Sequence, residues 1–398
     1  MGNRRGRHSD RHCRGRADAD RLDIALSRCR PLRHRARCSH DPGRHGESRA
    51  ERQMTVQDQT ITSNGEGLSI VRLPKQLLHV PITMAIFSLV VALLANSFWL
   101  SAATSAVALS LSVAGLAILY GQLGLVSLCQ FALVGVGGWV TLRIGHAFHP
   151  PFEVSLLTGG IVASIVGLAF GVPALRLRGL YLALVTLMLA GAFQIVVSAW
   201  GFPDGGPGFF GRADGSGREM LARPALAGGE VSYFLYVCAA AAIGLLIAQW
   251  HKLARPGRAW ALIRKGETVA VASGVNVLIY KAWAFALSGF LAGLAGGLLA
   301  GNVGQLDGRA FGAFDSLNLF ALAIVGGVFN WYGALIAGLL LRAVPALLTD
   351  LGIDGYVTIG IFGMALFHAL ATAPTGIAGQ ISGLIAWVGN KLSRGRDR

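Results

Sequence analysis

Long apolar runs recur along this sequence and decide what the chain can fold into. Runs of about 18 to 20 residues are long enough to cross the roughly 30 Å hydrocarbon core of a bilayer as helices. Only 14% of the residues are charged, whereas a soluble domain carries about 25%. The runs do not alternate between polar and apolar residues, which excludes a transmembrane β-barrel. The sequence therefore predicts an all-α polytopic membrane protein embedded in a lipid bilayer.

The runs predict about ten transmembrane helices. Lys and Arg concentrate in alternate loops, which favours both termini in the cytoplasm, the segment 251–279 inside and the loop 201–231 outside. The eighth crossing is short, so we expect it to be tilted, broken or re-entrant. The predicted crossings are 77–98, 101–119, 125–148, 154–172, 180–199, 232–250, 280–301, 317–329, 332–348 and 356–371.

The chain divides into three predicted regions: a basic tail at 1–76, a transmembrane domain at 77–372 and a basic cytoplasmic tail at 373–398. Residues 1–53 hold 15 Arg and 7 acidic residues with few apolar ones, which is typical of disorder. We expect Met54 to be the natural start, so that 1–53 are not translated. Cytoplasmic loops account for the positive charge after Met54, and no nucleic-acid partner is expected.

No catalytic, metal or cofactor motif is found in the sequence. None of the five lysines follows glycine as a G-x-x-x-x-G-K phosphate loop requires. The stretch 206–211 matches G-x-G-x-x-G but follows no strand and opens no helix, so we reject a dinucleotide site. The cysteines and histidines lack the spacing of a zinc finger. We expect a protein that is not an enzyme, and any energy for transport must come from a partner.

The stretch 255–300 joins a basic amphipathic segment to an apolar helix. Charges exclude the first half from the membrane, because each would cost about 2.5 to 3.5 kcal/mol at the bilayer centre. A basic helix beside a spanning helix is suited to docking a soluble partner on the cytoplasmic face. The charged residues are Arg258, Arg264, Lys265 and Glu267.

Three glycines recur at a spacing of four in the second half of this stretch: Gly289, Gly293 and Gly297. Small residues at that spacing let transmembrane helices approach closely. Plain helix packing is the favoured interpretation. The other is an interface along which a transporter rocks.

Polar residues lie among glycines between the second and third crossings. Gln122, Ser127 and Gln130 follow or flank Gly121 and Gly124. This pattern fits a broken helix, whose free backbone groups bind polar solutes in many transporters. It fits equally well a polar inner loop with hydrogen bonds between helices.

Arg342 lies within the ninth crossing, close to Pro345. An intramembrane charge is a functional hypothesis by default. We favour the other interpretation, in which Arg342 snorkels from the outer end of the crossing to the membrane surface.

Four stretches, in order, resemble the branched-chain amino acid permease family of ABC importers, specifically its LivM-type permease subunit. The resemblance covers about residues 110–350. The four stretches are the glycine-rich 124–137, the L-R-L-R-G-x-Y motif with its following V-T-L at 175–187, the basic 258–285 and the GG-x-x-x-x-x-G motif at 326–338.

The resemblance implies that 77–372 is the permease domain of a bacterial ABC importer in the inner membrane. It would translocate branched-chain amino acids by ATP-driven alternating access, with ATP-binding subunits, a homologous second permease subunit and a periplasmic substrate-binding protein as partners. Related permeases carry urea or other small polar solutes. The implied docking residues for the ATPase are Arg258, Arg264, Lys265, Glu267 and Gly274, and the implied path residues are Gln122, Ser127, Gln130 and Thr186.

An ion-coupled secondary transporter is the alternative from another class. It would need paired carboxylates inside the membrane to bind protons or sodium ions. Glu153, Asp315 and Asp350 lie at the ends of predicted crossings instead. The sequence therefore favours the importer over this alternative.

Overall fold

The computed structural model describes residues 75–353 except 176, 178 and 213–217, together with 376–380 and isolated positions between 357 and 367. All the regular elements in these residues are helices. Eight are long and apolar enough to cross a membrane, so the described chain is that of a multi-pass α-helical membrane protein. They are α2 (Lys75–Leu94), α3 (Ser97–Leu116), α4 (Gln130–Phe148), α5 (Phe152–Gly171), α6 (Leu180–Trp200), α7 (Glu230–Leu253), α10 (Val277–Val303) and α12 (Trp331–Asp350).

The ten predicted crossings agree with these helices in part. The predicted crossing at 317–329 is α11 (Ala313–Gly326), an apolar helix of only 14 residues. The predicted crossing at 356–371 lies largely outside the described residues, as do the predicted tails at 1–76 and 373–398.

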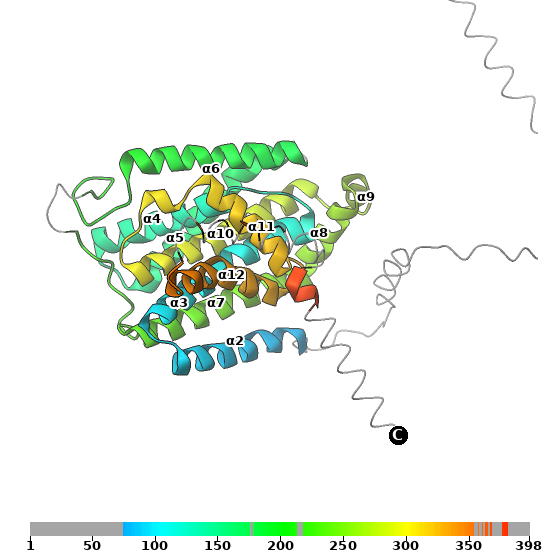
Figure 1. Ribbon diagram of the computed structural model, residues 1–398. Helices are drawn as coiled ribbons and strands as arrows, with labels where there is room; N and C mark the ends of the chain where they lie inside the picture. Colours follow the sequence, from blue (N-terminus) through cyan, green and yellow to red (C-terminus); the bar gives the residue numbers. More distant parts are fainter. Residues whose placement is uncertain are drawn as a thin grey trace, which may run out of the picture. The chain divides into compact units, whose positions relative to one another are not determined.

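The segments that connect the helices differ between the two ends of the bundle. Helix α7 runs from the loop at 201–229 to the short helices α8 (Arg255–Lys265) and α9 (Glu267–Ala272). We call the end with α8 and α9 the basic end, and the opposite end the loop end. Figure 1 shows α8 and α9 together beyond the ends of the longer helices.

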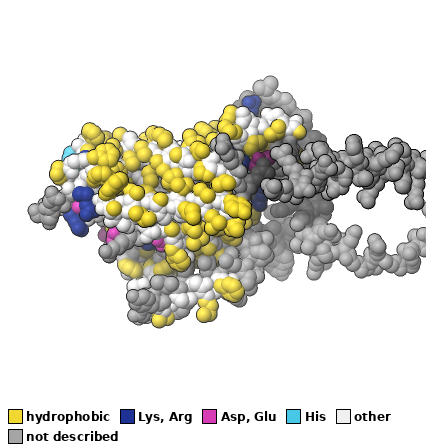
Figure 2. Space-filling view, turned by 90° about the horizontal axis from the view of Figure 1, so that it is seen from above, with side chains coloured by type: hydrophobic (Ala, Val, Ile, Leu, Met, Phe, Trp, Pro, Cys, Tyr) yellow, Lys and Arg dark blue, Asp and Glu magenta, His cyan; other side chains and the backbone are white. Residues whose placement is uncertain are grey.

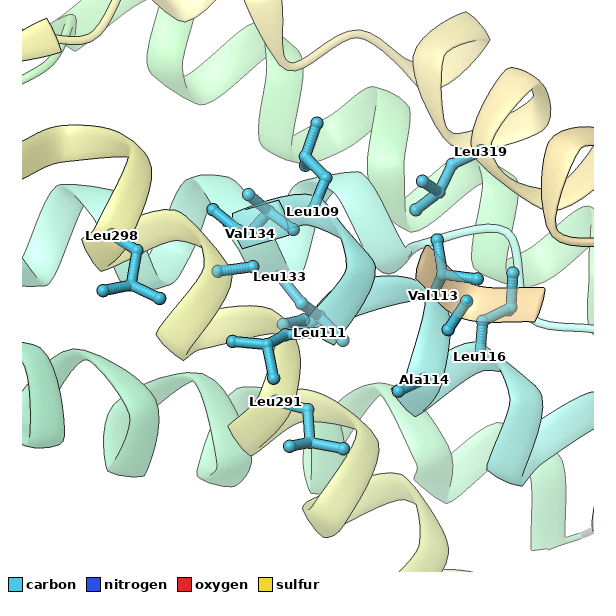
Figure 3. Packing of buried hydrophobic residues seen from close by; sticks show 14 of the residues in the cluster. Leu109, Leu111, Val113, Ala114, Leu116, Leu133, Val134, Leu291, Leu298 and Leu319 are labelled. Carbon is cyan, nitrogen blue, oxygen red and sulfur yellow. The ribbon is translucent and has the colours of Figure 1, made fainter. Parts of the chain in front are cut away.

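Helices α3 and α10 form the centre of the bundle. They are the most buried of the spanning helices; α10 packs against α3, α4 and α5, and α3 packs against α7, α10 and α12. Asn96 starts α3 and Asn276 starts α10, because each side-chain oxygen accepts a hydrogen bond from a backbone N–H of the first turn. Figure 3 shows leucines and valines of α3, α4, α10 and α11 filling the space between these helices.

Glycines set the close approach of α10 to its neighbours. A Cβ atom built on Gly293 would lie 2.5 Å from the Cβ of Ala163 and 2.9 Å from the carbonyl oxygen of Gly159. On Gly137 of α4 it would lie 2.3 Å from the Cα of Gly293. No side chain larger than hydrogen fits at these contacts without moving a helix. Gly289 and Gly297 have similarly close neighbours on α5 and α4.

Apolar side chains cover the outside of the bundle. Large exposed examples on α6 are Tyr181, Met188 and Ile195. Figure 2 shows hydrophobic side chains across the middle of the viewed face, with charged side chains toward its two ends. A surface of this kind is stable in a bilayer rather than in water.

The chain folds back into the bundle between α3 and α4. Helix α3 continues as a π-helical turn, η1 (Ala117–Gln122), and residues 124–129 are non-helical before α4 begins at Gln130. Gly124 has φ of 74°, a left-handed conformation that glycine adopts without strain. Helix α4 therefore begins five residues later than the predicted third crossing, and residues 123–129 separate it from η1.

Helix α4 begins near the middle of the membrane-spanning region. The side chain of Gln130, its first residue, bonds to Ser112 and Ser288. Helix α3 and η1 together form one continuous span of 26 residues, Ser97–Gln122, and Ser112 is its sixteenth residue. Ser288 is the twelfth of the 27 residues of α10. The observed backbone is that of a broken helix, and Gln130 also makes the hydrogen bonds between helices that the other sequence interpretation expected.

Helix α11 begins at a similar depth, approached from the loop end. The backbone N–H of Phe131 in α4 donates to the Oγ of Ser316 in α11, 3.3 Å away. The N-terminal turns of α4 and α11 therefore meet inside the bundle, although the two helices run from there toward opposite ends.

Candidate functional site

Helix α8 lies against the bundle through one apolar side. Trp260 is completely buried, and its indole N–H donates to the carbonyl oxygen of Tyr280 at 2.9 Å. Ala259 and Ile263 are buried beside it, whereas Arg258 and Lys265 are exposed. The amphipathic pattern of this helix therefore buries one side against the membrane domain and presents basic residues on the other.

Arg264 connects α8 to two other parts of the bundle. Its guanidinium donates to the carbonyl oxygen of Gly121 in η1. The same group lies 5.3 Å from the ring centroid of Phe329, in the loop between α11 and α12, a cation–π arrangement. Arg264 therefore links α8 to the turn that precedes α4 and to the turn that follows α11.

Glu267 connects α9 to α10. Its Oε1 lies 2.7 Å from the Nζ of Lys281, whose side chain is only 2% exposed. Glu267 is also the first residue of α9, where the positive end of the helix dipole favours a carboxylate. This ion pair fixes the start of α9 against the first turns of α10.

The outer side of α8 and α9 is exposed in this chain. Gly274, with φ of 77°, turns the chain from α9 toward the Asn276 cap of α10. Val269 and Val271 are 50% and 64% exposed. We call residues 255–274 the docking segment. Its exposed residues include Arg255, Arg258, Ala261, Lys265, Thr268, Val269, Val271 and Gly274.

Hydrogen bonds of neutral groups join α3, α4 and α10 inside the bundle. The amide nitrogen of Gln130 donates to the carbonyl oxygens of Ser112 and Ser288, each at 3.2 Å. The Oγ of Ser288 donates to the amide oxygen of Gln130, also at 3.2 Å. All three residues are buried, so Gln130 lies in packed protein and serves as a cross-link between helices.

Helix α6 contacts the starts of both inner helices. The Oγ1 of Thr186 accepts from the N–H of Leu128 at 2.9 Å, just before α4. The amide oxygen of Gln194 accepts from the N–H of Ala313, the first residue of α11, at 3.2 Å. We call this set of groups the central junction: Gln130, Ser288, Thr186, Gln194 and Ser316.

The structure brings together only part of the predicted path. Gln130 and Thr186 belong to the central junction, and the Oγ of Ser127 lies 3.3 Å from the Sγ of Cys129 close by. Gln122 lies elsewhere, in a small cavity of about 40 Å³ at the basic end that Lys252 and Phe329 also line. The four predicted path residues therefore do not line one cavity.

Sequence reasoning missed the partners of these residues. Ser288 and Gln194 lie within apolar runs, where single polar residues are inconspicuous, and Ser316 directly precedes such a run. Lys281 lies near the start of a spanning helix, and its spacing from Glu267 does not by itself indicate an ion pair. The contacts across α4, α6, α10 and α11 depend on tertiary structure and leave no local pattern.

A polar cavity opens at the loop end. Its volume is about 680 Å³, and its lining includes Asp204, Arg212, Arg218, Gln305 and Asp307. Both signs of charge are present in its lining.

Comparison with known proteins identifies the family. Residues 98–370 match the family model described as branched-chain amino acid transport system / permease component. The chain is 27% identical over 263 residues to the high-affinity branched-chain amino acid transport system permease proteins LivM of Escherichia coli strain K12 and Salmonella typhimurium strain LT2. The match covers 59% of this chain and 60% of each relative, and no solved structure matches. The family match spans α3 to α12, the helices that carry the docking segment and the central junction, and the chain therefore belongs to the branched-chain amino acid transport permease family.

Proposed function

We propose that this chain is the transmembrane permease subunit of a bacterial ABC importer in the inner membrane. Separate ATP-binding subunits drive alternating access, a homologous second permease subunit completes the translocation path, and a periplasmic protein delivers the solute. The cargo is branched-chain amino acids. Family membership supports the transport role and the cargo, and the docking segment supports the ATP-driven mechanism.

The arrangement of the docking segment is the observation that carries the proposal. The segment has an exposed basic and apolar side, yet its inner side is linked to three elements at once. Arg264 contacts η1 and the α11–α12 loop, and Glu267 contacts α10. A force applied to α8 and α9 is therefore delivered to the turn that precedes α4, to the turn that joins α11 to α12 and to the central helix α10.

The close glycine contacts support a role in the transport cycle. Gly289 and Gly293 place α10 directly against the backbone of α5, Gly293 also lies against Gly137 of α4, and Gly297 lies against the side chains of Leu156 and Thr141. Helices that meet through such smooth surfaces slide past each other with little side-chain rearrangement. In this proposal α10 moves as a unit when the ATPase displaces α9.

Uptake of radiolabelled leucine into proteoliposomes that contain this chain and its candidate partners tests the proposal. We expect uptake that requires both ATP on the side of the ATP-binding subunit and the subunit itself. Liposomes without that subunit are the control. Uptake by this chain alone, driven by an ion gradient, would contradict the proposal, and ATPase stimulation by another solute but not by leucine would contradict the assigned cargo.

A further inference from the structure

Arg342 is an exposed cation at membrane depth. It is the twelfth of the 20 residues of α12, about 17 Å along the axis from the start of the helix. The helix continues to Asp350, so Arg342 lies nearer the middle of the span than the snorkelling interpretation assumed. Its side chain is exposed in the single chain.

Lipid is an unfavourable neighbour for this side chain. A central arginine that faces hydrocarbon costs about 2.5 to 3.5 kcal/mol on the insertion scale and more in other estimates. Such residues face a water-filled path or another protein surface instead. The exposure of Arg342 therefore indicates that this side of α12 is not a lipid-facing side.

Asp315 supplies the opposite charge across the contact between α11 and α12. It is the third residue of α11, and its Oδ2 accepts from the N–H of Gly312 at 3.1 Å. Helices α11 and α12 pack against each other (Figure 1), so the two helices bring opposite charges to one contact. In the part of the chain that the structure describes, no contact within 4 Å joins the two groups.

Apolar side chains lie beside the two charges. Phe314 and Leu317, on either side of Asp315 along α11, are 68% and 38% exposed. Asn318, one turn after Asp315, is half-buried. We call this surface the α11–α12 face: Phe314, Asp315, Leu317, Asn318 and Arg342.

We propose that the α11–α12 face binds a zwitterionic amino acid with an aliphatic side chain during its passage through the membrane. Arg342 holds the carboxylate, since a guanidinium matches its two oxygens. Asp315 holds the ammonium, and Phe314 and Leu317 contact the aliphatic side chain. The inference rests on the proposed function, in which a second permease subunit encloses the path on the open side of this face.

Cysteine accessibility tests this site without depending on the transport rate. Arg342→Cys and Leu317→Cys are made separately, in a chain whose own cysteines are replaced by serine, and the assembled complex is treated with a charged, membrane-impermeant thiol reagent. Leu317→Cys keeps both charges, so it remains informative if Arg342→Cys fails to fold. Ile161→Cys is the matched control, because Ile161 is 53% exposed on α5 near the middle of that helix.

We expect both face cysteines to react at least tenfold faster than the control, and we expect leucine to slow their reaction at least fivefold. Reaction no faster than at Ile161→Cys would overturn the proposal and assign this face to lipid. Reaction that leucine leaves unchanged would overturn the binding role.

Transport measurements separate this inference from the proposed function. With the unsubstituted complex active, Arg342→Gln and Asp315→Asn should each lower ATP-driven leucine uptake at least tenfold while binding of the ATP-binding subunit stays unchanged. Normal uptake in both variants would overturn the site alone. Absence of uptake in the unsubstituted complex, with normal labelling and leucine protection at the face, would contradict the proposed function instead.

Discussion

The docking segment and the central junction are held in place by different interactions. Two charged contacts, those of Arg264 and Glu267, fix the docking segment together with the buried Trp260. The central junction contains only neutral groups, each with one to three hydrogen bonds to other elements of the bundle. Hydrogen bonds to charged groups contribute about 1.5 to 3 kcal/mol, whereas those between transmembrane helices average about 0.6 kcal/mol.

This difference has a mechanical meaning. In the proposed function, a few strong contacts would make the docking segment a rigid lever on η1 and α10. The weaker contacts of the central junction would let α4, α6 and α11 exchange partners during the transport cycle. The contrast predicts that single substitutions will be costly in the first region and mild in the second.

The largest loss is expected for Glu267→Gln. The substitution leaves the buried ammonium of Lys281 without its charged partner, and removing one member of a buried pair costs about 3 kcal/mol or more. Thermal unfolding of the purified chain in detergent measures the loss. Adding Lys281→Met should restore most of the stability, because it removes the unpaired charge.

Glu230→Gln is the matched control for this prediction. Glu230 is the exposed first residue of α7, so its loss should cost only about 0.5 kcal/mol through the helix dipole. Equal losses at Glu230 and Glu267 would show that the docking segment does not depend on its ion pair.

A smaller loss is expected for Gln130→Leu. It removes the hydrogen bonds to Ser112 and Ser288, and we expect about 1 to 2 kcal/mol of destabilisation, within the measured range for interhelical bonds. Ser288→Ala should cost about half as much, and the double variant should cost little more than Gln130→Leu alone. Additive losses would show that Gln130 and Ser288 do not act as a pair.

Most of the fold could be predicted from the apolar runs, because each spanning helix needs a long apolar stretch and most charged residues lie between these stretches. The starts of α4 and α11 could not be placed from these runs. Residues 123–129 are as apolar as a helix, and only the tertiary bonds of Gln130 and Ser316 show that the chain folds back there. The glycines at 121 and 124 therefore predict a break in the helix, but they do not indicate how deep in the membrane the break lies.

The predicted site residues differ in the same way. Arg258 and Lys265 are exposed on the docking segment, as an amphipathic pattern can indicate. Arg264, although exposed, donates to Gly121, and Glu267 pairs with Lys281. No pattern in one segment shows which of these charges make contacts with other helices. The sequence places Asp315 and Arg342 near the ends of crossings. Asp315 is indeed the third residue of α11, whereas Arg342 lies nearer the middle of α12 because that helix continues to Asp350.

Affinity of the purified permease for its ATP-binding subunit tests the central claim most directly. Arg258→Glu combined with Lys265→Glu changes exposed residues only, so the unfolding free energy should change by less than about 0.5 kcal/mol, the smallest stability effect predicted. Arg218→Glu, which reverses an exposed charge at the loop end, is the control. We expect the affinity to fall at least tenfold in the double variant and to stay unchanged in the control. Unchanged affinity in the double variant would contradict the assignment of α8 and α9 as the docking segment.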